Sequence, residues 1–247
     1  NVYGVDIKQD AIDLTCFSLS VALCAELMRD AKADNTSVLD DLQKHKLPSL
    51  KAGLHGNNLF SRDFFVQLES GLPHAGQFSL VIGNPPFDAI ASAIAERVAT
   101  APSPGLPETV AWPSGVPGNQ ICYHFLREAP RLLKEGGIAC LIQKDAFLYN
   151  LGPEEFRSVL FRNWRVPQIL DFISVRHLFD AAKMGGGKVD TKVVAVFIEA
   201  VPPREDDVIT HVTFRKVSAV EQRLFFEVDA YDIHRVPVDI AMTDQKV

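Results

Sequence analysis

Apolar residues along this chain occur either in short continuous runs or at helical spacing. Residues 2–5 form a run that predicts a strand, and residues 9–29 place apolar side chains at 12, 16, 19, 23 and 27, the spacing of one helix face. Later runs predict buried strands at residues 79–83, 138–142, 168–173 and 193–198. Helices are predicted at residues 119–134, ended by Gly136 and Gly137, and at residues 153–163, which open on a proline.

This alternation of strands and helices predicts an α/β fold. The expected sheet is doubly wound and mostly parallel, with helices on both faces. Loops after Val5, before Arg62, after Gly83 and after Ile142 follow strands or plausible strands, so we expect them to share one edge. Ligands of such sheets bind beyond the carboxyl ends of the strands.

Changes in residue type along the chain predict its domain organisation. Residues 1–200 are expected to form one domain, with a long loop at 88–118 that is rich in proline and small residues. Residues 201–247 are expected to be a linker and the start of a C-terminal extension or target-recognition region.

Composition and charge narrow the class of protein. The 247 residues are 47% hydrophobic and 23% charged, as in an ordinary globular chain, and the four cysteines form no CxxC pair, which favours buried thiols in a reducing compartment. No apolar run approaches the ~20 residues of a membrane span, so we expect a cytoplasmic protein without a membrane partner. The net charge of −6 argues against coating nucleic acid, although residues 157–192 hold seven Lys or Arg against three Asp.

The run "SLVIGNPPFDA" carries the candidate chemistry. A strand ends there on Asn84-Pro85-Pro86-Phe87. Neither proline donates a backbone hydrogen bond, each fixes its own φ, and Asn84 is kept out of the helical region by the proline that follows it. The sequence therefore predicts a stiff, extended tip with one amide and one aromatic ring.

Four motifs together carry a resemblance to a known family: "YGVDIKQDAI", "HGNNLF", the tip "NPPF", and "FLREAPRLLKEGGIACLI". In order and spacing they resemble the S-adenosylmethionine-dependent amino-methyltransferases, most closely the DNA adenine-N6 methyltransferases of restriction-modification and phage-defence systems. The similarity extends from residue 2 to about residue 200. It implies a Rossmann-like fold with an antiparallel final strand, S-adenosylmethionine as cofactor, and double-stranded DNA with a flipped adenine as substrate.

The resemblance has further implications for partners and completeness. Restriction or specificity domains or subunits are expected partners. The family's first strand and glycine-rich loop would precede Asn1, so we expect residues 1–247 alone to bind the cofactor weakly and to be inactive.

The resemblance also assigns residues to the cofactor. Asp6 corresponds to the acid that holds the ribose, with Ile7 packing on the adenine ring. Asn58 stands where the family usually has an aspartate bonded to the adenine amine, and Leu59 takes a position that is often aromatic. Phe125 matches a phenylalanine of the adenine pocket, and Asn84 at the tip is counted with this set.

The same resemblance assigns residues to catalysis. The side-chain oxygen of Asn84 and the carbonyl of Pro85 would accept the two protons of the target amine, Phe87 would stack on a base taken out of the duplex, and Phe179 would pack against it. No general base is required for such a step.

Other interpretations stay open at the level of sequence. The tip serves methylation of protein glutamine or RNA in related enzymes, and the chain could instead be a catalytically inactive scaffold or DNA-recognition subunit. Asp6 is also explained as a helix cap, and Phe125 and Phe179 as core aromatics. "MGGGKVDT" lacks the spacing of a phosphate-binding loop.

Overall fold

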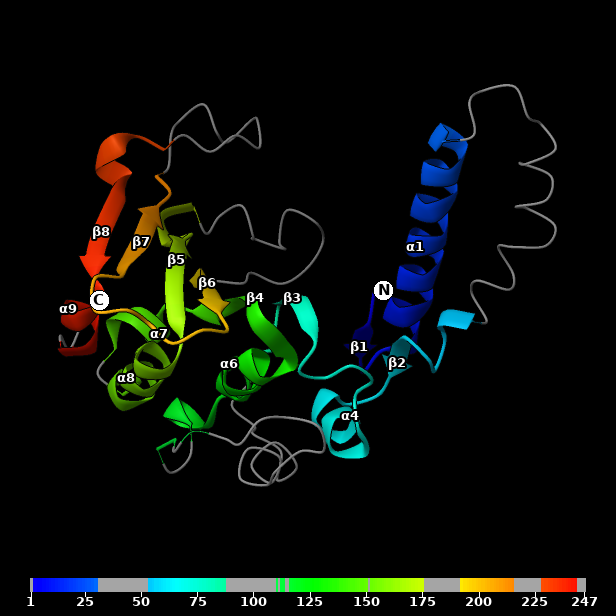
Figure 1. The fold of residues 1–247 in the computed structure, drawn as a ribbon, viewed down its shortest axis with the longest axis horizontal. Coiled ribbons are helices and arrows are strands. Elements are labelled where there is room, and N and C mark those ends of the chain that lie inside the picture. The colour runs from blue at the N-terminus through cyan, green and yellow to red at the C-terminus, as the bar shows by residue number, and fades with distance from the viewer. Residues whose placement is uncertain are drawn as a thin grey trace. The chain divides into compact units, whose positions relative to one another are not determined.

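The computed structural model forms two compact units, Asn1–Pro73 (unit 1) and His74–Val247 (unit 2), and each is described by itself (Figure 1). The structure describes residues 2–30, 53–87, 110, 112–113, 116–150, 152–175, 192–215 and 228–243. The loop predicted at 88–118 and the residue Phe179 therefore lie largely or wholly outside the described residues.

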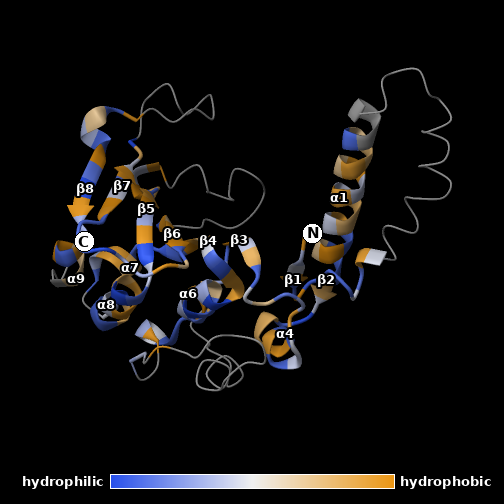
Figure 2. Cartoon of the chain, viewed as in Figure 1, coloured by the Kyte–Doolittle hydropathy of each residue, from blue (hydrophilic) through white to orange (hydrophobic). Residues whose placement is uncertain are grey.

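Unit 1 is built from a two-stranded parallel sheet and its helices. The elements are β1 (Gly4–Asp6), α1 (Gln9–Asp30), β2 (Leu59–Ser61) and α4 (Phe64–Ser70). Helix α1 confirms the helix predicted from the apolar spacing. Its buried side carries Ile12 and Cys16, which pack against Leu59, and apolar residues also cover much of the rest of the helix (Figure 2).

Unit 2 is built around a six-stranded sheet with the order β3-β4-β6-β5-β7-β8. The strands are β3 (Phe78–Gly83), β4 (Leu133–Lys144), β5 (Arg165–Asp171), β6 (Val193–Glu199), β7 (Val208–Thr213) and β8 (Ile233–Pro237). The pairing places β3, β4, β5 and β7 in one direction and β6 and β8 in the other. The predicted α/β fold with a mostly parallel sheet is confirmed, and β6 and β8 are its antiparallel strands.

Short helices connect these strands or, in the case of α9, follow the last of them. They are η2 (Pro117–Asn119), α6 (Ile121–Leu132), α7 (Ala146–Tyr149), α8 (Glu154–Asn163), η6 (Ala230–Asp232) and α9 (Val238–Thr243). Helix α6 packs on β3 and β4, where Ala139 and Leu141 are buried. Within unit 2 the alternate residues Leu80 and Ile82 of β3 are exposed, because the described helices α6 and α8 cover the other side of the sheet.

The core of unit 2 lies between this sheet and helices α6 and α8. Leu126 of α6, Phe161 of α8 and Val196 of β6 are all fully buried in it. Trp112, from the region predicted as a long loop, stacks on Phe156 and Trp164 with ring centroids 4.6 and 5.7 Å away. This aromatic stack packs the end of that region against α8.

One predicted helix end is wrong. Gly136 and Gly137 do not end α6, which stops at Leu132, two residues after Pro130; they lie inside β4. A Cβ on Gly137 would lie 2.7 Å from the backbone oxygen of Phe78 on β3. The glycine is therefore needed because β3 and β4 approach closely there.

Gly137→Ala should destabilise the protein by about 1–3 kcal/mol, because the added methyl group forces two backbones apart. Gly152 is the matched control, since a Cβ there meets no atom within 4 Å. Gly152→Ala should change the free energy of unfolding by no more than about 0.5 kcal/mol. Urea denaturation of both variants measures the difference, and equal stabilities would contradict the close approach.

Strand β5 also differs from its predicted bounds of 168–173. It begins at Arg165, and its register against β6 shifts between Arg165 and Gln168, where Pro167 has no N–H to donate. It ends at Asp171, whose Oδ1 accepts the Ile173 N–H at 2.8 Å and so turns the chain.

The boundary predicted at residue 200 is not a boundary of the sheet. Strand β7 pairs with β5 from Gln168↔Thr210 to Asp171↔Thr213, and β8 pairs with β7. Residues 201–207 are the connection from β6 to β7, which is held by Asp207 through its pairs with Arg165 and the Arg204 N–H. A recognition role for residues 201–247 stays a prediction.

Candidate functional site

The tip Asn84–Phe87 directly follows β3 at the carboxyl edge of the unit 2 sheet. Asn84 is exposed, Pro85 is buried, and Phe87 is half-buried against the core. Among the described residues, no group forms a hydrogen bond with the Asn84 side chain. The buried proline thus anchors the tip while the amide of Asn84 stays exposed, and its role toward a ligand stays a prediction.

The end of β4 lies beside this tip. The Lys144 Nζ is 6.0 Å from the centre of the Phe87 ring. The next residue, Asp145, donates its N–H to the Lys192 carbonyl at 3.1 Å, and its carboxylate lies 4.0 Å from the Lys192 Nζ. Lys144 was not among the residues predicted from the sequence, although the residues after 142 were expected at this edge as a loop; the structure places Lys144 at the end of β4.

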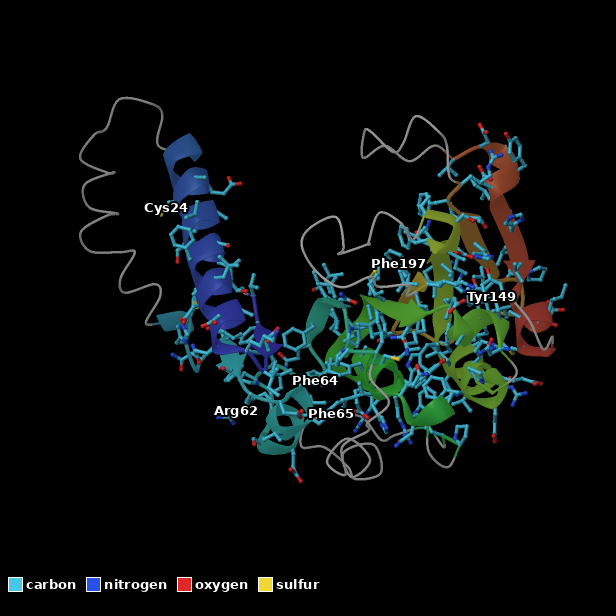
Figure 3. The ribbon with its side chains drawn as sticks, turned by 180° about the vertical axis from the view of Figure 1, so that it is seen from behind. Cys24, Arg62, Phe64, Phe65, Tyr149 and Phe197 are labelled. Carbon is cyan, nitrogen blue, oxygen red and sulfur yellow. The ribbon has the colours of Figure 1, made fainter. Side chains whose placement is uncertain are left out.

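A buried carboxylate at this edge contacts side chains from two other elements, α7 and β7. Asp171, the last residue of β5, accepts the Tyr149 hydroxyl at 2.5 Å and lies 3.6 Å from the His211 Nε2 of β7 (Tyr149 is labelled in Figure 3). Burial and the bond to Asp171 raise the pKa of Tyr149. Burial alone would raise the pKa of Asp171, but the nearby His211 imidazole and the hydrogen bonds from the Tyr149 hydroxyl and the Ile173 N–H outweigh it and hold that pKa below its ordinary value.

The lowered pKa of Asp171 predicts a loss of stability in acid. A carboxylate whose pKa is lower in the folded state stabilises it above the unfolded pKa, and this contribution is lost as pH falls through the folded value. The free energy of unfolding should therefore fall below about pH 4, and less steeply in Asp171→Asn than in wild type. Tyr149→Phe should have an intermediate slope. Urea denaturation at several pH values measures it, and identical slopes in all three proteins would contradict the assignment.

Asp6 and Ile7 lie at the carboxyl end of β1 in unit 1. The Asp6 Oδ1 accepts the Lys8 N–H at 2.7 Å, just before α1, so the helix-cap interpretation is partly correct. No described residue donates a hydrogen bond to the Asp6 Oδ2, so this exposed oxygen could accept one from a ribose hydroxyl. Ile7 is 71% exposed and offers an apolar surface for an adenine ring. Both residues fit the cofactor role that the resemblance implies.

The structure does not bring Asn58 together with Asp6. The register pairs Gly4 with Leu59 and Asp6 with Ser61, so Asn58 lies at the amino end of the ladder. Its Nδ2 donates to the Val2 carbonyl at 3.0 Å, which leaves its Oδ1 as the acceptor. Ser61 and Arg62 reach the Asp6 end instead, and the Arg62 N–H donates to the Asp6 carbonyl at 3.0 Å (Arg62 is labelled in Figure 3).

The remaining predicted cofactor residues, Leu59 and Phe125, pack against other side chains of their own units. Leu59 is 1% exposed and packs against Ile12 and Cys16 of α1, so its side chain presents no surface in unit 1. Phe125 of α6 is half-buried and packs against the core of unit 2. Whether they contact the cofactor stays a prediction.

The basic stretch at 157–192 contributes less exposed charge than its composition indicates. Arg157 is 1% exposed and donates from Nη1 to the Phe147 and Asn150 carbonyls at 2.7 and 2.9 Å. Arg165 pairs with Glu199 and Asp207. Arg157 therefore holds the fold together from a buried position, whereas Arg162, Arg165 and Lys192 are the described members that keep exposed charge.

Neither a metal cluster nor a membrane span is present among the described residues. No group of three or more of their His, Cys, Asp or Glu side chains could hold a metal ion. No described helix combines the length and apolar character that crossing a membrane requires.

A family model for the Eco57I restriction-modification methylase matches residues 1–179. The chain belongs to this family. Membership confirms the predicted methyltransferase fold class and S-adenosylmethionine as the cofactor of such methylases. A search of curated protein sequences finds no match to this chain.

Several solved structures are similar to this member of the Eco57I family at low identity. A chain from a study of complex assembly in a type I restriction-modification system is 14% identical over 88% of this chain, with a TM-score of 0.48. The type ISP enzyme LlaBIII bound to DNA is 12% identical over 86%, with a TM-score of 0.47. The M protein of the type I enzyme EcoKI is 15% identical over 78%, with a TM-score of 0.44. The chain spans 41%, 18% and 41% of their lengths.

Proposed function

We propose that this chain is the catalytic part of a DNA methyltransferase of a restriction-modification or phage-defence system, and that it methylates the N6 amine of an adenine. The observation that carries the proposal is the tip after β3. Its amide is exposed and makes no hydrogen bond among the described residues, while the proline beside it is buried. This arrangement fits a ligand that brings N–H donors to the tip.

The chemistry of the target explains two acceptors at one tip. The exocyclic amine of adenine is a poor nucleophile because its lone pair is delocalised into the ring. The Asn84 Oδ1 and the Pro85 carbonyl would accept its two protons and favour a more tetrahedral nitrogen, which frees the lone pair. S-adenosylmethionine supplies the methyl group as a sulfonium. The contribution of the tip is positioning and electrostatics rather than proton removal beforehand.

Aromatic residues would hold the target base. An amine inside a duplex cannot be reached, so the adenine must be flipped out. Phe87 is half-buried, so part of its ring stays accessible for stacking while the core fixes its position. Phe179, which lies outside the described residues, is proposed from the family resemblance to pack on the same base.

Two residues of unit 1 are proposed to contact the cofactor. Asp6 offers a carboxylate oxygen for the ribose diol, and Ile7 offers apolar surface for the adenine ring. The Asn58 Oδ1 could accept a hydrogen bond only from a group that reaches the amino end of the ladder between β1 and β2. We also propose a cytoplasmic location, with restriction or specificity subunits as partners.

The experiment that tests the function offers three substrates to the complete protein. Tritiated S-adenosylmethionine is supplied with duplex DNA, with RNA, or with a protein that carries an accessible glutamine. Label in DNA alone supports the proposal. Label in RNA or protein would replace it with the open alternative, and cofactor binding without transfer to any substrate would indicate an inactive recognition subunit.

A further inference from the structure

Lys144 is placed at the tip by the fold of β4. From Gly137 onward the residues of β4 alternate in burial, and Lys144 is the last of them, half-buried at the carboxyl edge next to the end of β3. Its Nζ lies 6.0 Å from the Phe87 ring centre, at the outer limit of a cation–π contact. The ring therefore helps to position this charge without neutralising it.

Lys144 differs from two arginines of the same sheet and its connections in having no carboxylate partner among the described residues. Arg165 pairs with Glu199 and Asp207, and Arg215 pairs with Asp229 and Asp232. The adjacent carboxylate, Asp145, lies within ion-pair distance of Lys192 instead. A cation that is partly removed from water and has no carboxylate partner is stabilised strongly by an anion that a ligand brings to it.

We propose that the Lys144 ammonium binds a phosphate of the DNA strand that carries the target base. A nucleotide has a flat base at one end and an anion at the other. It can therefore present its base to the accessible part of Phe87 and a phosphate to the cation that lies over that ring, 6.0 Å from its centre. The inference rests on the proposed function, and it assigns to β4 a substrate contact that the tip sequence does not reveal.

Removal of this contact should reduce both the affinity for DNA and the dependence of that affinity on salt. When a protein neutralises DNA phosphates, the logarithm of its binding constant falls linearly with the logarithm of the salt concentration. Each lost phosphate contact makes the slope of that line less steep by about 1. Between about 50 and 200 mM salt, wild type should therefore lose about 3.5-fold more affinity than Lys144→Met. Lys144→Arg should keep the wild-type slope because it keeps the charge.

Lys134 is the matched control. It belongs to the same strand but is exposed at the amino end, so Lys134→Met should keep the wild-type slope. Fluorescence anisotropy of the complete protein with a labelled duplex measures all four proteins, and thermal unfolding checks that each is folded. If Lys144→Met does not fold, Lys144→Gln takes its place in the comparison.

The outcomes separate this inference from the proposed function. An unchanged slope in the folded Lys144 variant would overturn the phosphate contact, even where wild type methylates DNA. An equal decrease in the Lys134 variant would also overturn it, because the effect would then be one of net charge. Failure of wild type to methylate DNA would instead overturn the proposed function.

Discussion

Asn84→Ala is expected to lower the rate of methyl transfer to duplex DNA by ~10²–10³, the usual cost of removing one preorganised partner of a transition state. Cofactor binding should stay nearly unchanged, since the Asn84 side chain is assigned mainly to the target amine. Single-turnover transfer from labelled S-adenosylmethionine measures the rate, and equilibrium dialysis measures cofactor affinity.

Two further variants test the reason for that loss. Asn84→Asp should be less damaging than alanine because an acceptor oxygen remains in place. Ser79→Ala is the control, since Ser79 is exposed on the same strand away from the tip and should leave the rate unchanged. A near-normal rate in Asn84→Ala would show that the tip is only a turn.

Phe87→Ala is expected to weaken both transfer and the hold on the extruded base. Stacking of a base on an aromatic side chain contributes roughly 1–3 kcal/mol, which corresponds to about 5-fold to 150-fold in affinity. The loss should be smaller for a duplex with a mismatch at the target adenine, because extrusion then costs less. Binding and single-turnover rates on matched and mismatched duplexes measure it.

Phe87 also packs against the core, so a loss of fold must be distinguished from a loss of stacking. Phe87→Leu keeps an apolar side chain there but removes the ring, and it should share the defect of the alanine variant with less loss of stability. Phe87→Tyr should be tolerated best because it keeps the stacking face. Full activity in the leucine variant would assign Phe87 to packing alone.

The elements that the sequence predicts well are those whose signal is local. Helix α1 follows from apolar spacing within its own span, and the tip follows from two prolines after an apolar run. The end of α6 was mispredicted because Gly136 and Gly137 resemble a helix stop, whereas Gly137 is required by the backbone of β3. That requirement depends on strand pairing about 60 residues apart in the chain.

The candidate site residues likewise divide into those with a local sequence signal and those whose position depends on distant parts of the chain. Asn84, Pro85 and Phe87 are neighbours in sequence, so their placement at the end of β3 could be predicted. The position of Asn58 could not, because a shift of register in a two-stranded ladder moves it from one end to the other. The cluster of Tyr149, Asp171 and His211 was missed because its members come from three separate elements.

The most direct test of the central claim is nucleoside analysis of DNA methylated by the complete protein. Duplex DNA is incubated with S-adenosylmethionine, digested to nucleosides and analysed by mass spectrometry, beside a parallel reaction with Asn84→Ala. We expect N6-methyladenine as the product of wild type and at most a trace of it with the variant. Methylcytosine as the product, or equal amounts of N6-methyladenine from both proteins, would contradict the account.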